Sequence, residues 1–134
     1  MEQSRCAAIP LFAGLDEAAL SALAGAASET EAAPGTVVVS ERDFGHAMYA
    51  IESGTAEVVC AGEVLQKLGP GDVFGEVAVI ATGRRTASVV ATSPMKLIRF
   101  FKRDVWALER RAPAVAAELR RLITERQQTV NPAS

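Results

Sequence analysis

The spacing of apolar residues changes twice along the chain and divides it into helical and strand-like regions. Near the N-terminus, the apolar lead-in of residues 9–15 ends at Asp16, a residue type that commonly caps helices. Leu20, Leu23 and Ala24 then fall on one face at helical spacing. We therefore expect an N-terminal helix that begins directly after Asp16.

The middle of the chain consists of short apolar segments separated by glycine and proline, beginning at the Pro34-Gly35 turn. Strand-like segments occur at 37–39, 46–51, 55–60, 64–68, 86–91 and 96–101. Short strands at this spacing are typical of a jelly-roll or a barrel. The pattern therefore predicts an α+β fold with an antiparallel, jelly-roll-like β-roll at about 28–101.

The last third of the chain returns to helical spacing. Residues 102–111 predict one helix, with Val105 and Leu108 facing inward, and Pro113 suits the first turn of another. The second helix has an apolar stripe of Val115, Leu119, Leu122 and Ile123. We expect two C-terminal helices at about 102–128, no helix-turn-helix after them, and a single domain over residues 1–134.

Composition narrows the class of protein. The chain has 134 residues, 49% of them hydrophobic, and a formal net charge of −2, so nothing global indicates nucleic acid binding. Cys6 and Cys60 lack metal-ligand spacing, and the single His46 disfavours a metal-dependent cupin. The sequence contains no run long enough to span a membrane and no catalytic constellation. We expect a cytoplasmic chain that is not an enzyme and holds no metal or cofactor.

Charge is distributed unevenly. Residues 1–83 carry 3 basic and 12 acidic side chains, whereas residues 84–134 carry 11 basic and 4 acidic ones. One interpretation is that the two parts attract each other and that the charges are solvated. The other is that some of the arginines meet an anionic ligand or partner.

The most informative segment is residues 74–89, which read Phe-Gly-Glu-Val-Ala-Val-Ile-Ala-Thr-Gly-Arg-Arg-Thr-Ala-Ser-Val. Glu76 and Arg85 stand nine positions apart with small residues beside them, and a short helical turn is expected between them. A guanidinium forms paired hydrogen bonds with phosphate oxygens, and backbone N–H groups at the start of a helical turn favour an anion. A carboxylate accepts from a ribose hydroxyl. These groups together suit a cyclic phosphate fused to a ribose.

This segment resembles the phosphate-binding cassette of the cyclic nucleotide-binding domain family. Residues 74–80 and 85–89 match the family pattern in order, without a gap in the spacing. A Pro-Leu-Phe lead-in at residues 10–12 also matches, so the resemblance covers roughly residues 9–126. One departure is Arg84, where the family usually has proline, and it leaves open which arginine binds the phosphate.

The resemblance implies roles for individual residues. It assigns the ribose 2′-hydroxyl to Glu76, the cyclic phosphate to Arg85, and further phosphate contacts to the backbone N–H groups of Ala78 and Ala87. The expected ligand site comprises Gly75, Glu76, Val77, Ala78, Arg85, Thr86, Ala87 and Ser88, with Arg120 of the last helix as a lid over the base. The Ser88 hydroxyl can contact the phosphate or the guanine amino group, so it does not exclude cGMP.

The resemblance also implies a fold and a function. The fold is a double-stranded β-helix roll with an N-terminal helix, a short cassette helix and two C-terminal helices. The function is a sensor of cyclic nucleotide, cAMP in preference to cGMP, that signals through movement of its C-terminal helices, with Val79 pressing on their hinge. The alternatives are a degenerate interaction module that binds no nucleotide, or the sensor part of a transcription regulator or ion channel. The effector and a homodimer through the last helix stay open.

Overall fold

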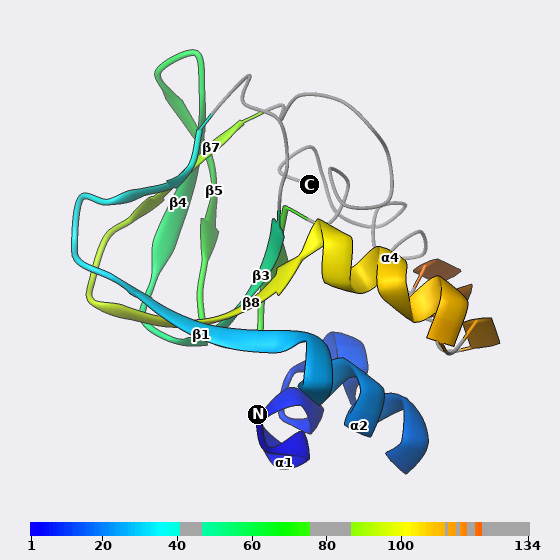
Figure 1. Cartoon of the computed structure of the whole chain (residues 1–134). Coiled ribbons are helices and arrows are strands. Elements are labelled where there is room, and N and C mark those ends of the chain that lie inside the picture. Colours follow the sequence, from blue (N-terminus) through cyan, green and yellow to red (C-terminus); the bar gives the residue numbers. More distant parts are fainter. Residues whose placement is uncertain (41–46, 76–86, 112, 115, 118–119, 122–134) are drawn as a thin grey trace.

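The computed structural model describes residues 1–40, 47–75, 87–111, 113–114, 116–117 and 120–121 (Figure 1). Its helices are α1 (Gln3–Ala7), a 3₁₀ turn η1 (Pro10–Phe12), α2 (Glu17–Ala26) and α4 (Lys102–Arg111). Its strands are β1 (Ala27–Ala32), β2 (Val37–Val39), β3 (Ala47–Ser53), β4 (Ala56–Cys60), β5 (Glu63–Leu68), β6 (Val73–Phe74), β7 (Ser88–Ala91) and β8 (Met95–Phe101). The later described residues, between 113 and 121, are also helical.

The strands form two four-stranded sheets in the orders β1-β8-β3-β6 and β2-β7-β4-β5, and every pairing is antiparallel. In Figure 1 the helices α1, α2 and α4 gather at one side of the β1-β8-β3-β6 sheet, and the β2-β7-β4-β5 sheet lies on its other side. The predicted α+β fold with an antiparallel β-roll is therefore confirmed.

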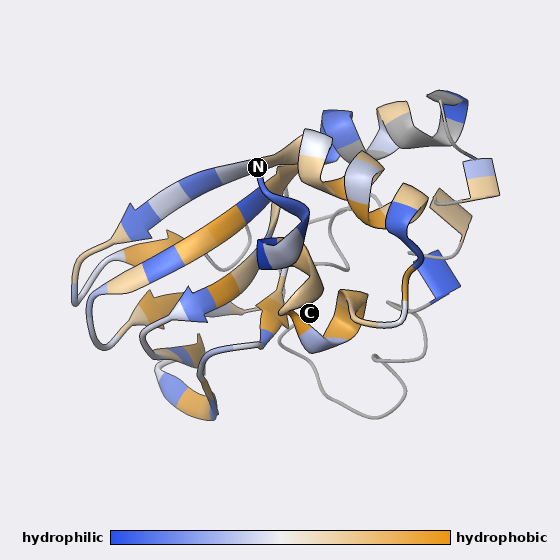
Figure 2. Cartoon of the chain, turned by 90° about the horizontal axis from the view of Figure 1, so that it is seen from below, coloured by the Kyte–Doolittle hydropathy of each residue, from blue (hydrophilic) through white to orange (hydrophobic). Residues whose placement is uncertain are grey.

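The first sheet is buried on both faces because successive side chains of a strand point to opposite sides. One set of residues, which we call the roll interior, fills the space between the sheets. It comprises Ala32, Val39, Ile51, Ala56, Val58, Leu68, Phe74, Ala87, Val89, Ala91, Met95 and Leu97. Figure 2 shows hydrophobic and hydrophilic residues alternating along these strands.

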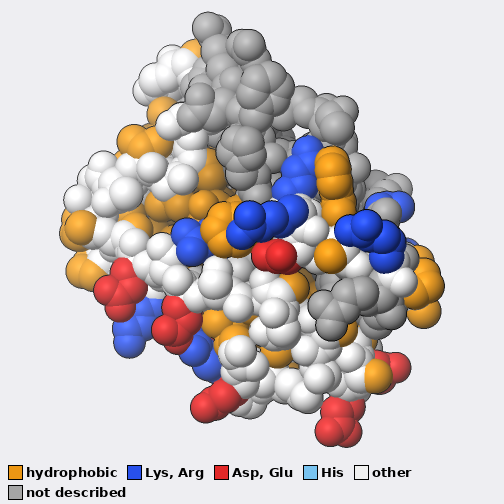
Figure 3. Space-filling view, in the orientation of Figure 1, with side chains coloured by type: hydrophobic (Ala, Val, Ile, Leu, Met, Phe, Trp, Pro, Cys, Tyr) orange, Lys and Arg blue, Asp and Glu red, His pale blue; other side chains and the backbone are white. Residues whose placement is uncertain are grey.

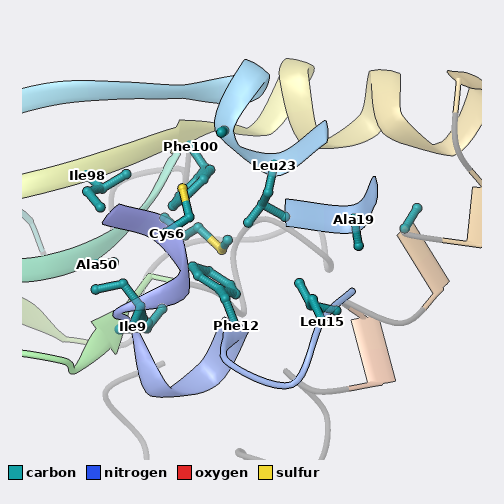
Figure 4. Close-up of a cluster of buried hydrophobic side chains, with 13 residues drawn as sticks. Cys6, Ile9, Phe12, Leu15, Ala19, Leu23, Ala50, Ile98 and Phe100 are labelled. Carbon is teal, nitrogen blue, oxygen red and sulfur yellow. The ribbon is translucent and has the colours of Figure 1, made fainter. Parts of the chain in front are cut away.

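A second set, the helix-facing cluster, packs the outer face of this sheet against the N-terminal helices (Figure 4). It includes Cys6, Phe12 and Leu23 on the helical side, and Ile98 and Phe100 on the sheet. The rings of Phe12 and Phe100 meet edge to face, with centroids 5.5 Å apart and an interplanar angle of 74°. Complete burial of such a side chain stabilises the fold by about 1.5–3 kcal/mol.

The predicted caps and helices are observed where the sequence signals were strong. The Asp16 carboxylate accepts a hydrogen bond from the backbone N–H of Ala19 at 2.8 Å, which fixes the start of α2. The predicted helix at residues 102–111 is confirmed as α4, which follows β8 without an intervening loop. Farther along, Ala116 is buried in the helix-facing cluster.

The strand predicted at 64–68 is confirmed as β5, but its N-terminal apolar residues are not core. Val64 and Leu65 are 51% and 44% exposed. The register between β4 and β5 shifts between Val58 and Val59, so the pairing moves from Gln66 to Val64 and passes over Leu65. Since β5 is also the edge strand of its sheet, this end of the hairpin is left open to solvent.

Candidate functional site

The first end of the sequence-predicted cassette is held by β6. Gly75 follows Phe74, is buried, and adopts a φ of 79°, a left-handed conformation that favours glycine. Just before β6, Asp72 accepts a hydrogen bond through its side chain from the N–H of Gly69 at 2.8 Å. The carbonyl of Asp72 accepts from the N–H of Ile51 at 2.9 Å, so β3 fixes the approach to the cassette.

The second end of the cassette begins β7 in the opposite sheet. Ala87 is 3% exposed and belongs to the roll interior, as does Phe74 beside the first end. Ser88 is half-buried and lies opposite Val59 of β4. The fold thus brings the two flanks of the predicted cassette to the same interior, one from each sheet.

Most of the predicted ligand contacts lie outside the described residues. These are Glu76, Val77, Ala78, Arg85 and Thr86, together with Arg84 and the hinge candidates Val79 and Ile80. His46 lies outside them as well, and so do the side chains of Val105 and Leu108. The predicted lid residue, Arg120, is an exposed helical residue. The roles assigned to these residues stay predictions, as do those of Gly75, Ala87 and Ser88.

The sequence reasoning missed Tyr49, which lies beside the first cassette flank, and Gln66, which lies in the same sheet as the second flank but two strands away. Tyr49 of β3 stacks on Phe74, with ring centroids 5.2 Å apart and an interplanar angle of 15°, and packs against the roll interior. Gln66 of β5 lies opposite the fully buried Val58. The signal that could have revealed Gln66 is a polar residue at an inward position of an alternating strand.

A separate pocket of about 460 Å³ is lined by Arg5 of α1 and by residues of β1, β3 and β8, and none of the predicted ligand residues lines it. Arg5 of α1 donates to both carboxylate oxygens of Glu52, from Nε at 2.9 Å and from Nη2 at 2.5 Å, and also pairs with Glu29. These two carboxylates raise the pKa of the Arg5 guanidinium above its usual value. Because Arg5 is paired with Glu52 and Glu29, we interpret these ion pairs as a structural link between α1 and the sheet and not as a ligand site.

Basic side chains of the C-terminal third contact aromatic rings. On the face shown in Figure 3, Lys and Arg side chains lie beside hydrophobic ones. The guanidinium carbons of Arg99 and Arg103 lie 4.4 Å and 5.5 Å from the centroid of the Phe101 ring. The Lys102 ammonium lies 4.8 Å from the ring centroid of the exposed Trp106. Cation–π contacts therefore hold part of the basic charge at the junction of β8 and α4.

Within the described ranges, His, Cys, Asp and Glu side chains do not gather in any group of three or more suited to a metal ion. The helices of that same part of the chain are all too short or too polar to cross a membrane.

Comparison with known proteins was made by family model, sequence and structure. The family model described as "Cyclic nucleotide-binding domain" matches residues 29–111. A cyclic AMP receptor protein of Thermus thermophilus is 36% identical over 97 residues, which is 69% of this chain and 45% of the relative. A cAMP-dependent protein kinase regulatory subunit of Hypocrea atroviridis is 36% identical over 89 residues, 66% of this chain and 19% of that protein. The chain thus spans less than half of each of these relatives.

Among solved structures, the N-terminal domain of a transcriptional regulator from Streptomyces coelicolor A3(2) superposes with a TM-score of 0.77. It is 28% identical in sequence, and the match covers 90% of this chain and 87% of that one. The structural match is therefore longer than the segment that the family model matches.

Proposed function

The chain belongs to the cyclic nucleotide-binding domain family, and from this premise we propose that it is a sensor module for cyclic nucleotides, with cAMP preferred over cGMP. The observation that carries the proposal is the placement of the cassette flanks. Phe74 of β6 and Ala87, which directly precedes β7 of the opposite sheet, both belong to the roll interior, so a ligand held between the two flanks would be enclosed by the roll.

In the proposed site the two charged residues of the cassette act at opposite ends of the ligand. Arg85 neutralises the cyclic phosphate through paired hydrogen bonds, and backbone N–H groups at Ala78 and Ala87 add donors. Glu76 accepts from the ribose 2′-hydroxyl, away from the phosphate that it would repel. Gly75 supports this arrangement, because its left-handed φ and lack of a side chain let the backbone turn at the entrance to the cassette.

Signalling would follow from a shift between two positions of the C-terminal helices. The ligand binds better to the form in which they close over the base, with Arg120 stacking on the purine. Reversing a 1:99 ratio of closed to open chains to 99:1 requires about 5.5 kcal/mol of differential binding. The packing of Ala116 into the helix-facing cluster supports this route, because it links the second C-terminal helix to the N-terminal helices and β8.

The signal requires a partner that responds to the position of the C-terminal helices. An effector fused to this chain, as in a transcription regulator or an ion channel, a second protein, or a second copy bound through the last helix would each serve. A competing function is an interaction module that has lost nucleotide binding. Its supporting observation is Arg84, which replaces the usual proline of the cassette and adds a charge there.

Titration calorimetry with cAMP and cGMP in parallel tests the proposal. We expect the wild-type chain to bind cAMP, and Arg85→Ala to weaken binding by at least about 30-fold, or ~2 kcal/mol, because the phosphate loses its charged partner. Arg84→Ala is the matched control, since it removes a neighbouring charge. If Arg85→Ala binds cAMP as tightly as the wild type, Arg85 is not the phosphate ligand. If neither protein binds a cyclic nucleotide, the chain is not a sensor.

A further inference from the structure

The side-chain carbonyl oxygen of Gln66 is buried and lacks a hydrogen-bond partner among the residues that the structure describes. Buried polar atoms in native proteins are almost always paired, so an exception of this kind requires an explanation. An acceptor that is shielded from water and left unpaired destabilises the chain that carries it. Such an atom is well suited to a donor that arrives from outside the chain.

The strand register shows where this amide lies. Gln66 pairs with Val58 on β4, and Val58 pairs with Val89 on β7. Val58 and Val89 are both fully buried members of the roll interior. Residues directly opposite one another in a sheet point to the same face, so the Gln66 side chain points inward as well.

The same row of residues leads to the second flank of the cassette. Val89 stands two positions after Ala87, and β4 alone separates its strand from β5. Adjacent strands are about 4.8 Å apart, so Gln66 and Val89 are separated by roughly 10 Å across the sheet. A mononucleotide whose phosphate is held by the cassette is long enough to bring its base to the far side of this row.

We propose that Gln66 accepts a hydrogen bond from the exocyclic amino group of the adenine base and is a specificity-determining residue of the site. This inference rests on the proposed function, because it assigns the base end of the same ligand. The amide offers an acceptor beside a donor, which complements the amino group and the neighbouring ring nitrogen of adenine. Guanine carries a carbonyl oxygen at that position, so the same contact would require the amide to turn over and present its NH2 group instead of the unpaired oxygen.

The experiment compares cAMP with its analogue purine riboside 3′,5′-cyclic phosphate, which lacks only the amino group. The wild-type chain should bind cAMP about tenfold more tightly than the analogue. Gln66→Leu and the more closely shaped Gln66→Met should bind both ligands with the affinity that the wild type has for the analogue. Lys67→Ala is the matched control, because Lys67 is exposed on the same strand, and it should retain the tenfold preference.

Three outcomes overturn the inference. The wild type shows no preference for cAMP over the analogue, or both Gln66 variants keep the full preference. Alternatively, the ligand-free variants unfold at a clearly lower denaturant concentration, which would show that the amide stabilises the roll itself. We expect their unfolding midpoint to be unchanged or raised, because an unpaired buried oxygen has been removed. A wild-type chain that binds neither ligand fails at the proposed function instead, and Gln66 then has no base to read.

Discussion

Tyr49 and Phe74 are cross-strand partners whose rings stack nearly parallel, 15° apart, immediately before the cassette. The strand that carries Phe74 has only two residues, so its ladder hydrogen bonds are few. An aromatic pair of this kind contributes about 0.5–1.5 kcal/mol beyond the area that it buries. The position of the first cassette flank is therefore set by a ring on β3 as well as by the backbone.

Replacement of Gly75 by alanine should destabilise the chain and weaken cAMP binding. A residue with a side chain destabilises the fold by about 1–2 kcal/mol when its φ is held at 79°. The backbone would relax from this conformation and displace the start of the cassette. Urea unfolding and calorimetry measure the two effects. Gly25→Ala is the matched control: Gly25 lies in α2, where nothing lies within 4 Å of an added Cβ, so this change should stabilise by about 0.5–1 kcal/mol. Equal behaviour of the two variants would contradict the argument.

Glu76→Ala should reduce the affinity for cAMP while leaving the affinity for 2′-deoxy-cAMP almost unchanged. The proposed partner of the carboxylate is the 2′-hydroxyl, and a hydrogen bond to a charged group contributes about 1.5–3 kcal/mol, or roughly 10- to 150-fold in affinity. Calorimetry with both ligands on both proteins completes the comparison. A similar loss for the two ligands would show that Glu76 supports the fold of the cassette and not the ribose.

Phe12 and Phe100 should show energetic coupling, because their edge-to-face contact joins the N-terminal helices to β8. Phe12→Leu, Phe100→Leu and the double variant form a double-mutant cycle in urea unfolding. We expect the double variant to lose about 0.5–1.5 kcal/mol less than the sum of the single losses. Strict additivity would mean that the rings stabilise the cluster independently.

The stability of the chain should fall above about pH 9. The Cys6 thiol is fully buried, and desolvation raises its pKa above the usual 9.0. Below pH 9 the thiol is neutral in the folded and the unfolded chain, so it leaves the free energy of unfolding unchanged with pH. Above pH 9 the thiol ionises more readily in the unfolded chain, which lowers the free energy of unfolding by at most about 1.4 kcal/mol per pH unit. Urea unfolding from pH 7 to 10.5 under reducing conditions measures this decline. Cys6→Ala should remove the part of the slope due to this thiol, whereas Cys60→Ala should keep it.

Sequence patterns predicted the elements whose signals are local. The cap at Asp16, the alternation of the central strands and the helix at residues 102–111 all follow from neighbours in the chain. The sequence pattern did not predict β1 as a separate strand. Its sequence, Ala-Ser-Glu-Thr-Glu-Ala, has low strand propensity, and the segment becomes a strand by pairing with β8. The short α1 was missed for a similar reason: five residues form a helix only when packing holds them.

The candidate site divides in the same way. Its charged residues are visible because Glu76 and Arg85 lie in one continuous motif. Strand pairing places Tyr49 opposite Phe74 and puts Gln66 two strands away from the second flank, and no local sequence pattern predicts which strands become neighbours. The positions of these two side chains relative to the cassette are therefore set by the pairing of strands that are distant in the sequence.

The region by which this family is recognised begins at residue 29, yet the helix-facing cluster depends on Cys6, Phe12 and Leu23. A chain that began at residue 29 would expose the outer face of the β1-β8-β3-β6 sheet to water and would leave Ala116 without the N-terminal side chains of its cluster. The unit that folds therefore includes the N-terminal helices, which precede the region that the family model matches. Truncated versions of such modules, when they fail to respond to a nucleotide, are better regarded as incomplete folds than as insensitive ones.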